Sequence, residues 1–341
     1  MNMYNWIERM IYGEKKPFPI LSFPSVQYLY ITVKELVCSS AYQAMGMRMI
    51  ADHYDMPAAP TFMDLSIEAE AFGAHCVYGV DEVPTIIGKL IATEEEADAL
   101  TVPEVGAGRT GLSIEAVRKA LMLITDRPIF AGCIGPFSLA GRLMNVNNIM
   151  VACYTEPETV HKVLEKATEF IINYLLEFKK AGANGAILAE PLAGLLSPEL
   201  MREFSTTYVS RIVRAVQDKH FILIYHNCGS AINQLVPEML DTGCLAYHFG
   251  ESADMEAMLK RIPRNFLVMG NISPSNAFNN NSAQNIKHVT TRLLNLCGSY
   301  NNFIISSGCD IPPYTDFDNI DAFFEVVQSF YYRQHLWDII M

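Results

Sequence analysis

The chain has 341 residues, of which half are apolar and 18% are charged, so it can bury a large core and is not disordered. Its net charge of −12, with no stretch rich in Lys and Arg, excludes recognition of a phosphate backbone, and we expect no nucleic-acid partner. No apolar run approaches the ~18 residues that span a membrane, and residues 1–23 contain no uninterrupted apolar segment of the secretory type. We therefore expect a cytoplasmic protein without a membrane partner.

The eight cysteines are too few for a disulfide framework in a chain of this length. Six of them are interpreted as small buried apolar residues: Cys38, Cys76, Cys133, Cys153, Cys244 and Cys297. The other two, Cys228 and Cys309, stand in unusual contexts that are considered below.

Residues 1–50 show no alternation of strand and helix, and we expect them to form a mostly helical N-terminal extension. Residues 51–341 are expected to form the rest of a single domain, which begins with a strand near 58–63. The stretch 88–125 is mainly helical and acidic, as in ATEEEADAL, and predicts an insertion.

From about residue 125 the pattern alternates between strand and helix. Short apolar runs predict strands at 128–135, 185–189, 221–225, 245–249, 266–270 and 303–306. Apolar residues at helical spacing predict helices at 157–181, 197–216, 230–241, 253–262, 283–297 and 319–333. Such alternation indicates an α/β fold with a parallel sheet, and seven to eight strands are enough for a (β/α)8 TIM barrel.

Polar or otherwise unusual residues directly follow most of these strands. They are Asp64, Gly135 with Pro136, Glu190, His226 with Cys228, His248 with Glu251, Asn271, and Cys309. In a barrel the carboxyl ends of the strands meet at one rim, where barrel enzymes place their chemistry. We therefore expect these residues to converge.

His226 and Cys228, in YHNCGS, together with Cys309, in SSGCDIPP, have the ligand types of an open zinc site. Cys309 follows Cys228 by 81 residues (309 − 228), which is compatible with the same rim. Three protein ligands leave the fourth position free, and a thiolate-rich set favours zinc. Zinc that activates water more often has His and carboxylate ligands, so this set favours activation of a thiol.

Several carboxylates are candidates for the same site. Asp64 follows an apolar run and is predicted to be a catalytic residue in the pocket. Glu190 is also predicted to be a catalytic residue, either as the fourth zinc ligand or in binding substrate, and the sequence does not choose between them. Glu68 and Glu70, in DLSIEAEAFGA, read first as solvated carboxylates at a helix start. Glu70 is nevertheless kept as a substrate-binding candidate, together with two rim residues, His248 and Asn271.

The segment GAGRTG, residues 106–111, matches a G-x-G-x-x-G pattern. A dinucleotide-binding loop requires a strand directly before it, whereas a Glu-rich helical pattern and TVPEV precede this one. The segment is therefore interpreted as an ordinary loop.

Three segments together resemble the uroporphyrinogen decarboxylase superfamily: DLSIEAEAFGA, PIFAGCIGPFSLAGRL and YHNCGS…GNISP…FIISSGCDIPPYTDFDNIDAF. Within it, the chain looks more like the cobamide-dependent methyltransferase branch, which carries His-x-Cys and a distant Cys as zinc ligands, matching His226, Cys228 and Cys309. The chain lacks the RQAGRY-type motif of the decarboxylases and has Gly308-Cys309 where they have Gly-His. Asp64 does match their FSD aspartate.

The resemblance implies a TIM barrel and transfer of a methyl group from a methyl-corrinoid to a zinc-bound thiol. No DxHxxG corrinoid-binding motif is present, so the corrinoid is expected on a partner protein, with a small-molecule thiol as the acceptor. Two alternatives stay open. One is a decarboxylase or lyase of the same superfamily, and the other is a non-catalytic, zinc-stabilised subunit of a methyltransferase complex.

Overall fold

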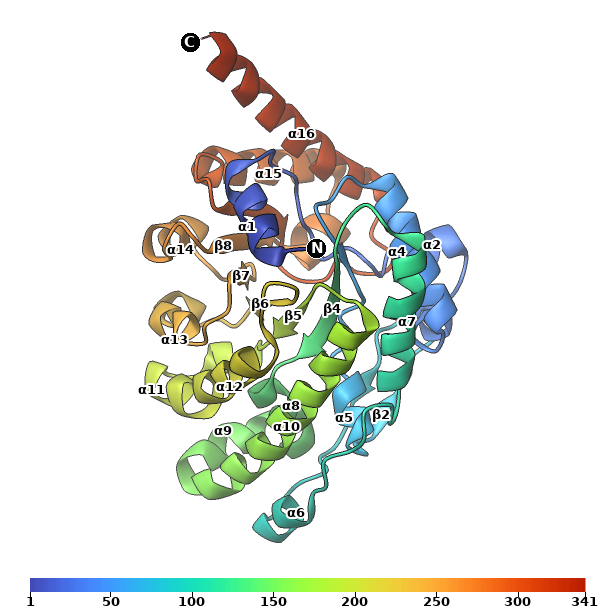
Figure 1. Cartoon of the computed structure of the whole chain (residues 1–341), viewed down its shortest axis with the longest axis vertical. Coiled ribbons are helices and arrows are strands. Elements are labelled where there is room, and N and C mark those ends of the chain that lie inside the picture. Colours follow the sequence, from blue (N-terminus) through green and yellow to red (C-terminus); the bar gives the residue numbers. More distant parts are fainter. Residues whose placement is uncertain (341) are drawn as a thin grey trace.

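The structure, a computed structural model, describes residues 1–340 and contains a sheet of seven parallel strands (Figure 1). The strands lie side by side in chain order, and every neighbouring pair is parallel. Their bounds are β1 Ala59–Pro60, β4 Ile129–Ile134, β5 Gly185–Ala189, β6 Ile222–Asn227, β7 Ala246–Phe249, β8 Leu267–Ile272 and β9 Phe303–Ser307. A separate antiparallel pair is formed by β2 Cys76–Val77 and β3 Thr85–Ile86. The predicted α/β fold with a parallel sheet is confirmed.

Helices surround this sheet and supply the crossovers between its strands. The α-helices are α1 Met3–Tyr12, α2 Ser25–Leu29, α3 Val33–Val37, α4 Ser40–His53, α5 Ile67–Ala71, α6 Glu94–Ala99, α7 Thr110–Leu123, α8 Pro136–Met144, α9 Val146–Thr155, α10 Pro157–Ala181, α11 Pro198–Met201, α12 Thr207–Val216, α13 Val236–Leu240, α14 Met255–Arg261, α15 Ala283–Cys297 and α16 Phe317–Ile340. Shorter helical turns are η1 Leu192–Leu195, η2 Arg202–Thr206, η3 Ile232–Gln234 and η4 Pro274–Asn279. Within residues 1–340, no helix combines the length and the apolar character needed to cross a membrane.

The ends of two predicted helices carry the expected signals. Gly182 ends α10 in the left-handed conformation, with φ of 108°, where a glycine is favoured. The Ser197 side chain accepts a hydrogen bond from the backbone N–H of Leu200 and so caps α11. The helix then widens into the π-type turn η2 before it continues as α12.

The prediction of an eight-stranded barrel is not confirmed for the described residues: the sheet is curled, with β1 and β9 at its edges. β1 is only two residues long. The N–H groups of Ala59 and Thr61 donate to the carbonyl oxygens of Pro128 (2.9 Å) and Phe130 (2.8 Å), and Pro57, two positions before Ala59, has no N–H with which to extend this ladder. Beside β9 lies an extended segment, in which the N–H of Phe18 donates to Ile305 (3.0 Å). This segment belongs to the stretch expected to be mostly helical, and it occupies the edge that an eighth strand would otherwise pair with.

The inner face of the curled sheet holds its own apolar core, which helix α1 covers. Side chains from six strands form this core: Phe130, Ile187, Ala189, Ile222, Ile224, Ala246, Leu267, Met269 and Ile304. Trp6 of α1 packs on Phe130, with 5.3 Å between ring centroids, and the N–H of Met3 donates to Lys219, just before β6. Helix α1, blue in Figure 1, therefore covers the amino end of the strands and leaves their carboxyl ends for a site.

We predict that Trp6→Ala destabilises the fold by roughly 3–5 kcal/mol, because it removes a buried indole from this core. The variant also loses the hydrogen bond from Trp6 Nε1 to the Pro57 carbonyl oxygen (3.2 Å). The free energy of unfolding in urea measures the effect, with the exposed Tyr4→Ala on the same helix as the control. Equal stability of the two variants would contradict the assigned role of α1.

Candidate metal centre

Three side chains converge at the carboxyl ends of β6 and β9. His226 lies in β6, Cys228 directly follows β6, and Cys309 lies two residues after β9. One ligand atom from each of the three lies within 4.8 Å of the other two. Residues that are 81 positions apart (309 − 228) are therefore brought to one place by the curl of the sheet. We refer to these three residues as the candidate metal centre.

The alternation of side chains along β6 explains why His226 faces inward. Ile222 and Ile224 belong to the inner core, and in a strand every second residue shares a face. His226 continues this series, and Cys228 follows at the next even position. His226 is the register partner of His248 on β7, which continues the inner series from Ala246.

Two glycines allow the loops that carry the cysteines to approach each other. A Cβ on Gly250, after β7, would collide with the Cβ of Cys228. A Cβ on Gly308 would lie 2.9 Å from the backbone nitrogen of Glu251, too close for a real side chain. Only a residue without a side chain fits at either position, so these glycines set the distance between the two thiol-bearing loops.

The donor set of the candidate metal centre suits a soft divalent cation. One imidazole and two thiols are the ligand types of three-residue zinc sites that keep a fourth position open. The two thiols share a hydrogen bond, which lowers the pKa of Cys228 and, with burial, raises the pKa of Cys309 to about 12. A bound cation would stabilise both thiolates at once, so the residues present fit zinc.

A chain of hydrogen bonds runs from the candidate metal centre into the protein. His226 Nδ1 and His248 Nδ1 lie 2.8 Å apart, and His248 Nε2 lies 2.7 Å from Ser306 Oγ. Ser306 in turn donates to the carbonyl oxygen of Phe18 (2.7 Å). Burial lowers the pKa of His248 well below its usual range. His248 was predicted to bind substrate, but both of its ring nitrogens are engaged within the protein.

Asn271, also predicted to bind substrate, holds the loop that follows β7. Its side-chain amide donates to the carbonyl oxygens of Gly250 (3.0 Å) and Ala253 (2.8 Å). The same loop carries the exposed Glu251, whose negative charge opposes the lowered pKa of Cys228. Glu251 follows the strand predicted at 245–249. Its place after that strand is the feature of the sequence that indicates a carboxylate at this end of the sheet.

Asp64 and Glu70 are both bound to Arg109. Arg109 Nη1 donates to Asp64 Oδ2, and Arg109 Nε donates to Glu70 Oε2 (2.7 Å). Arg109 Nη2 donates to Ser66 Oγ (2.8 Å), and the guanidinium lies over the Tyr78 ring at 4.9 Å. The Asp64 side chain is 1% exposed and that of Arg109 is 8% exposed, so this is a buried ion-pair cluster.

Arg109 is the residue that the sequence analysis missed. The first four residues of GAGRTG form a loop and the last two, Thr110 and Gly111, begin α7. The segment follows no strand directly, so the interpretation as a loop holds for residues 106–109. Its arginine binds the carboxylates of both Asp64 and Glu70. A single arginine in a glycine-rich loop was the available signal, but its partners lie about 40 residues earlier in the sequence.

The interpretation of Glu68 as a solvated carboxylate is wrong. Glu68 is 2% exposed, and its Oε1 accepts a hydrogen bond from the N–H of Ile134 (3.0 Å), whereas Oε2 has no partner. Burial raises the pKa of this carboxyl to about 7, against a partial opposing effect of that hydrogen bond. The predicted helix start is confirmed, since Glu68 lies in the first turn of α5. The side of α5 that carries Glu68 is covered by α8 and by the end of β4.

Glu190 lies on the outer face of the sheet, away from the candidate metal centre. Ala189 is part of the inner core, so the next residue points to the helices. Glu190 Oε1 accepts from the Ser138 N–H (2.9 Å) and Oε2 accepts from Ser205 Oγ (2.7 Å), and burial raises its pKa to about 7. This placement argues against Glu190 as the fourth zinc ligand or as a substrate contact.

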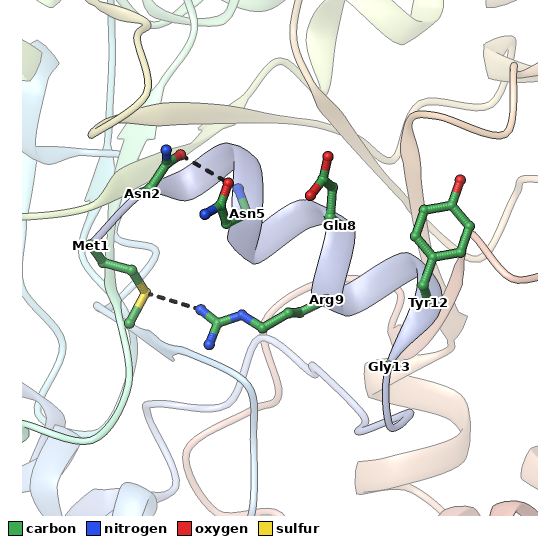
Figure 2. Close-up of a pocket in the computed structure, with 7 residues that line it drawn as sticks. All are labelled: Met1, Asn2, Asn5, Glu8, Arg9, Tyr12 and Gly13. Atoms are coloured by element: carbon green, nitrogen blue, oxygen red, sulfur yellow. Dashed lines mark hydrogen bonds between the residues drawn. The ribbon is translucent and has the colours of Figure 1, made fainter.

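A surface hollow lies beside α1, at the amino end of the strands (Figure 2). Met1, Asn2, Asn5, Glu8, Arg9, Tyr12 and Gly13 line it. Arg9 reaches toward the sulfur of Met1 at 3.8 Å, and the Asn2 side chain caps α1 by accepting from the backbone N–H groups of Tyr4 and Asn5 (Figure 2). The chemistry-bearing residues His226, Cys228 and Cys309 are at the carboxyl end, so this hollow is not the candidate active site.

Residues 30–330 match the family model for uroporphyrinogen decarboxylase (URO-D), and the chain therefore belongs to this family. Among characterised relatives, it is 24% identical to a methylcobamide:CoM methyltransferase of Methanosarcina acetivorans, over 97% of this chain and 100% of that protein. It is 25% identical to the uroporphyrinogen decarboxylase of Hydrogenovibrio crunogenus, over 89% of this chain and 85% of that protein.

A solved structure described as a methyltransferase from Methanosarcina mazei superposes with a TM-score of 0.84, at 20% identity, over 97% of this chain and 99% of that chain. That likeness establishes the fold. The predicted resemblance is confirmed: the chain is an enzyme of the uroporphyrinogen decarboxylase family, and the relatives that it matches over almost its full length include methyltransferases.

We predict that Arg109→Gln lowers the free energy of unfolding by roughly 3–5 kcal/mol, because it leaves Asp64 and Glu70 without their buried counter-charge. Urea denaturation at neutral pH measures the loss. Arg118→Gln on the exposed side of α7 is the matched control and should change stability little. A loss no larger than that of the control would show that the cluster is not a structural ion pair.

We predict that Glu68→Gln removes a pH-dependent part of the stability. The folded-state pKa of about 7 exceeds the usual 4.5, so the wild type loses stability as pH rises from 4.5 through 7. The loss approaches about 3 kcal/mol, the equivalent of a shift of that size, and is constant at higher pH. The glutamine adds only a pH-independent offset. Urea denaturation between pH 4.5 and 8.5 should show a flatter profile for Glu68→Gln than for the exposed Glu8→Gln, and parallel profiles would contradict the assignment.

Proposed function

We propose that this chain is a zinc-dependent methyltransferase that moves a methyl group from a methyl-corrinoid, held by a partner protein, to a thiol. The convergence of His226, Cys228 and Cys309 at the carboxyl end of the sheet is the observation that carries the proposal. The similarity to a methylcobamide:CoM methyltransferase over nearly the whole chain supports the corrinoid as the source of the methyl group.

His226, Cys228 and Cys309 would hold the zinc ion. His226 Nδ1 faces His248, so its Nε2 is the nitrogen available beside the two sulfur atoms. Zinc bound there would lower the pKa of an added thiol, so that the nucleophilic thiolate exists at neutral pH. The chain's own contribution is to leave one coordination position free and to surround it with two anionic sulfurs, which keep the acceptor sulfur electron-rich.

The exposed Glu251 is our candidate for a carboxylate beside the free fourth position. It lies in the loop held by Asn271, and its charge already acts on Cys228. Its carboxylate is not within the group of three converging ligand atoms, so a thiol can approach without first displacing a tightly placed side chain. Glu190 is not assigned this role.

Decarboxylation is the weaker alternative. Asp64 matches an aspartate of the decarboxylases, but here its carboxylate is bound to Arg109 and Ser66 within a buried cluster. Arg109 itself has its donors directed at Asp64, Glu70 and Ser66, so it offers little to a substrate carboxylate. No observation on the described residues favours a porphyrinogen substrate.

The metal proposal is tested first by the metal content of purified protein and by X-ray absorption at the zinc edge, with and without added thiols. One zinc per chain, with two sulfur ligands that become three on adding a thiol, would support the open site and identify an acceptor. A zinc ion with four protein ligands, whose coordination does not change on adding any thiol, would favour the non-catalytic, zinc-stabilised subunit instead. Thermal denaturation with a chelator separates these two interpretations, because a catalytic zinc can be removed while the protein stays folded.

We predict that Cys309→Ala loses both stoichiometric zinc and about 100-fold or more of the rate of methyl transfer, because only two protein ligands remain. The assay follows demethylation of free methylcobalamin in the presence of a panel of small thiols. Cys38, interpreted from the sequence as buried, is exposed and lies outside the candidate metal centre, so Cys38→Ala is the matched control. Full activity of Cys309→Ala would rule the mechanism out.

A further inference from the structure

In the series of hydrogen bonds that links His226, His248, Ser306 and Phe18, the donor and the acceptor of each bond can be assigned. This assignment determines which nitrogen of His226 can bind a metal. We infer that His248 and Ser306 are positioning residues that hold the proton of His226 on Nδ1 and thereby keep its Nε2 lone pair aimed at Cys228 and Cys309. This inference rests on the proposed zinc site, and it assigns to His248 a role other than substrate binding. It also links the candidate metal centre to the N-terminal segment.

The direction is set at the far end of the chain, by the backbone of Phe18. A carbonyl oxygen can only accept, so Ser306 must use its hydroxyl hydrogen to donate to Phe18 (2.7 Å). The Ser306 oxygen is then free to accept from His248 Nε2–H, which lies 2.7 Å away. Because the Phe18 carbonyl can only accept, it determines which group donates and which accepts in every other hydrogen bond of the series.

The same logic continues to His226. A neutral His248 that donates from Nε2 carries no hydrogen on Nδ1, so this nitrogen accepts from His226 Nδ1–H at 2.8 Å. His226 is then left with an unprotonated Nε2, the form that binds a metal. A ligating histidine typically has its other ring nitrogen bonded in this way, which fixes the tautomer and the ring orientation.

Burial makes this arrangement persistent. His226 is 2% exposed, His248 is 1% exposed and Ser306 is fully buried, so these hydrogen bonds are shielded from bulk solvent. A second proton on His248 would place an uncompensated charge in this interior, which is costly. The side chains also share the inner face of the sheet, because His226 and His248 are register partners and Ser306 continues the inner series from Ile304.

Zinc affinity tests the inference, measured on full-length variants by competition with a chelator of known affinity. Ser306→Ala and His248→Leu should each weaken zinc binding about 10–100-fold, the range for residues that support a metal ligand. His248→Gln should recover part of the loss, because its amide can accept from His226 and donate to Ser306. Affinities of Ser306→Ala and His248→Leu equal to the wild type would overturn the inference.

The chain provides a matched control one residue along β9. Ser307 is also fully buried, and its Oγ also contacts the N-terminal segment, as acceptor of the Ile20 N–H (3.0 Å). Ser307→Ala thus removes an equivalent hydroxyl that is outside the chain to His226. Ser307→Ala should leave zinc affinity unchanged. A loss of affinity equal to that of Ser306→Ala would show that both variants act only by disturbing the packing.

A spectroscopic readout does not depend on zinc. Two-bond ¹H–¹⁵N correlation spectra of protein labelled at histidine distinguish the two tautomers, and His226→Gln identifies the His226 signals. The inference predicts a proton on His226 Nδ1 in the metal-free wild type and a mixed or reversed tautomer in Ser306→Ala. A proton on Nε2 in the wild type would overturn it. If the wild type binds no zinc, the proposed function fails while this measurement still decides the inference.

Discussion

The placement of the candidate metal centre depends on one geometric constraint, the alternation of side chains along parallel strands that are held in register. His226 and His248 are partners in the β6–β7 ladder, and both continue inner-facing series. A shift of one residue in either strand would turn its histidine out toward the helices. This register is held by the inner apolar core, which includes Ile224 and is covered by α1. The packing that stabilises the fold therefore also positions the candidate metal ligands.

Buried charge is handled in a different way in each part of the carboxyl end. Around Asp64, Arg109 supplies a counter-charge within a fully packed cluster. Glu190 has no cation and instead accepts two hydrogen bonds, while Glu68 has one oxygen without a partner, and both carboxyls have pKa values raised to about 7 by burial. At the candidate metal centre, by contrast, two thiols that can both become thiolates have their sulfur atoms within 4.8 Å of each other. A cation is the natural complement there, and this contrast distinguishes the candidate metal centre from the buried carboxylates elsewhere in the fold.

The sequence predicted the strands and the convergence of His226, Cys228 and Cys309, but not the face of the sheet on which each strand-end residue lies. Strands such as GAILA, residues 185–189, are apolar on both faces because helices cover one side and the inner core the other. They carry no alternation signal, so the sequence could not separate Glu190, which points outward, from His226, which points inward. The partners of Arg109 and the contact of Phe18 with β9 were equally hidden, because they join residues that are far apart in sequence and depend on tertiary packing.

Overall similarity does not decide the reaction, since the chain is about equally identical to a methyltransferase (24%) and to a uroporphyrinogen decarboxylase (25%). Either reaction, methyl transfer or decarboxylation, can be carried at the carboxyl ends of the strands of this fold. The function therefore depends on the side chains at those positions. In this chain, an arginine binds the aspartate that matches the decarboxylase motif, and thiols stand at the ends of β6 and β9. Because the hydrogen-bond chain through Ser306 ends on Phe18, the N-terminal segment that borders the open edge of the sheet also reaches the ligand set. The same stretch of chain that leaves the sheet without an eighth strand therefore supports the chemistry that we propose for it.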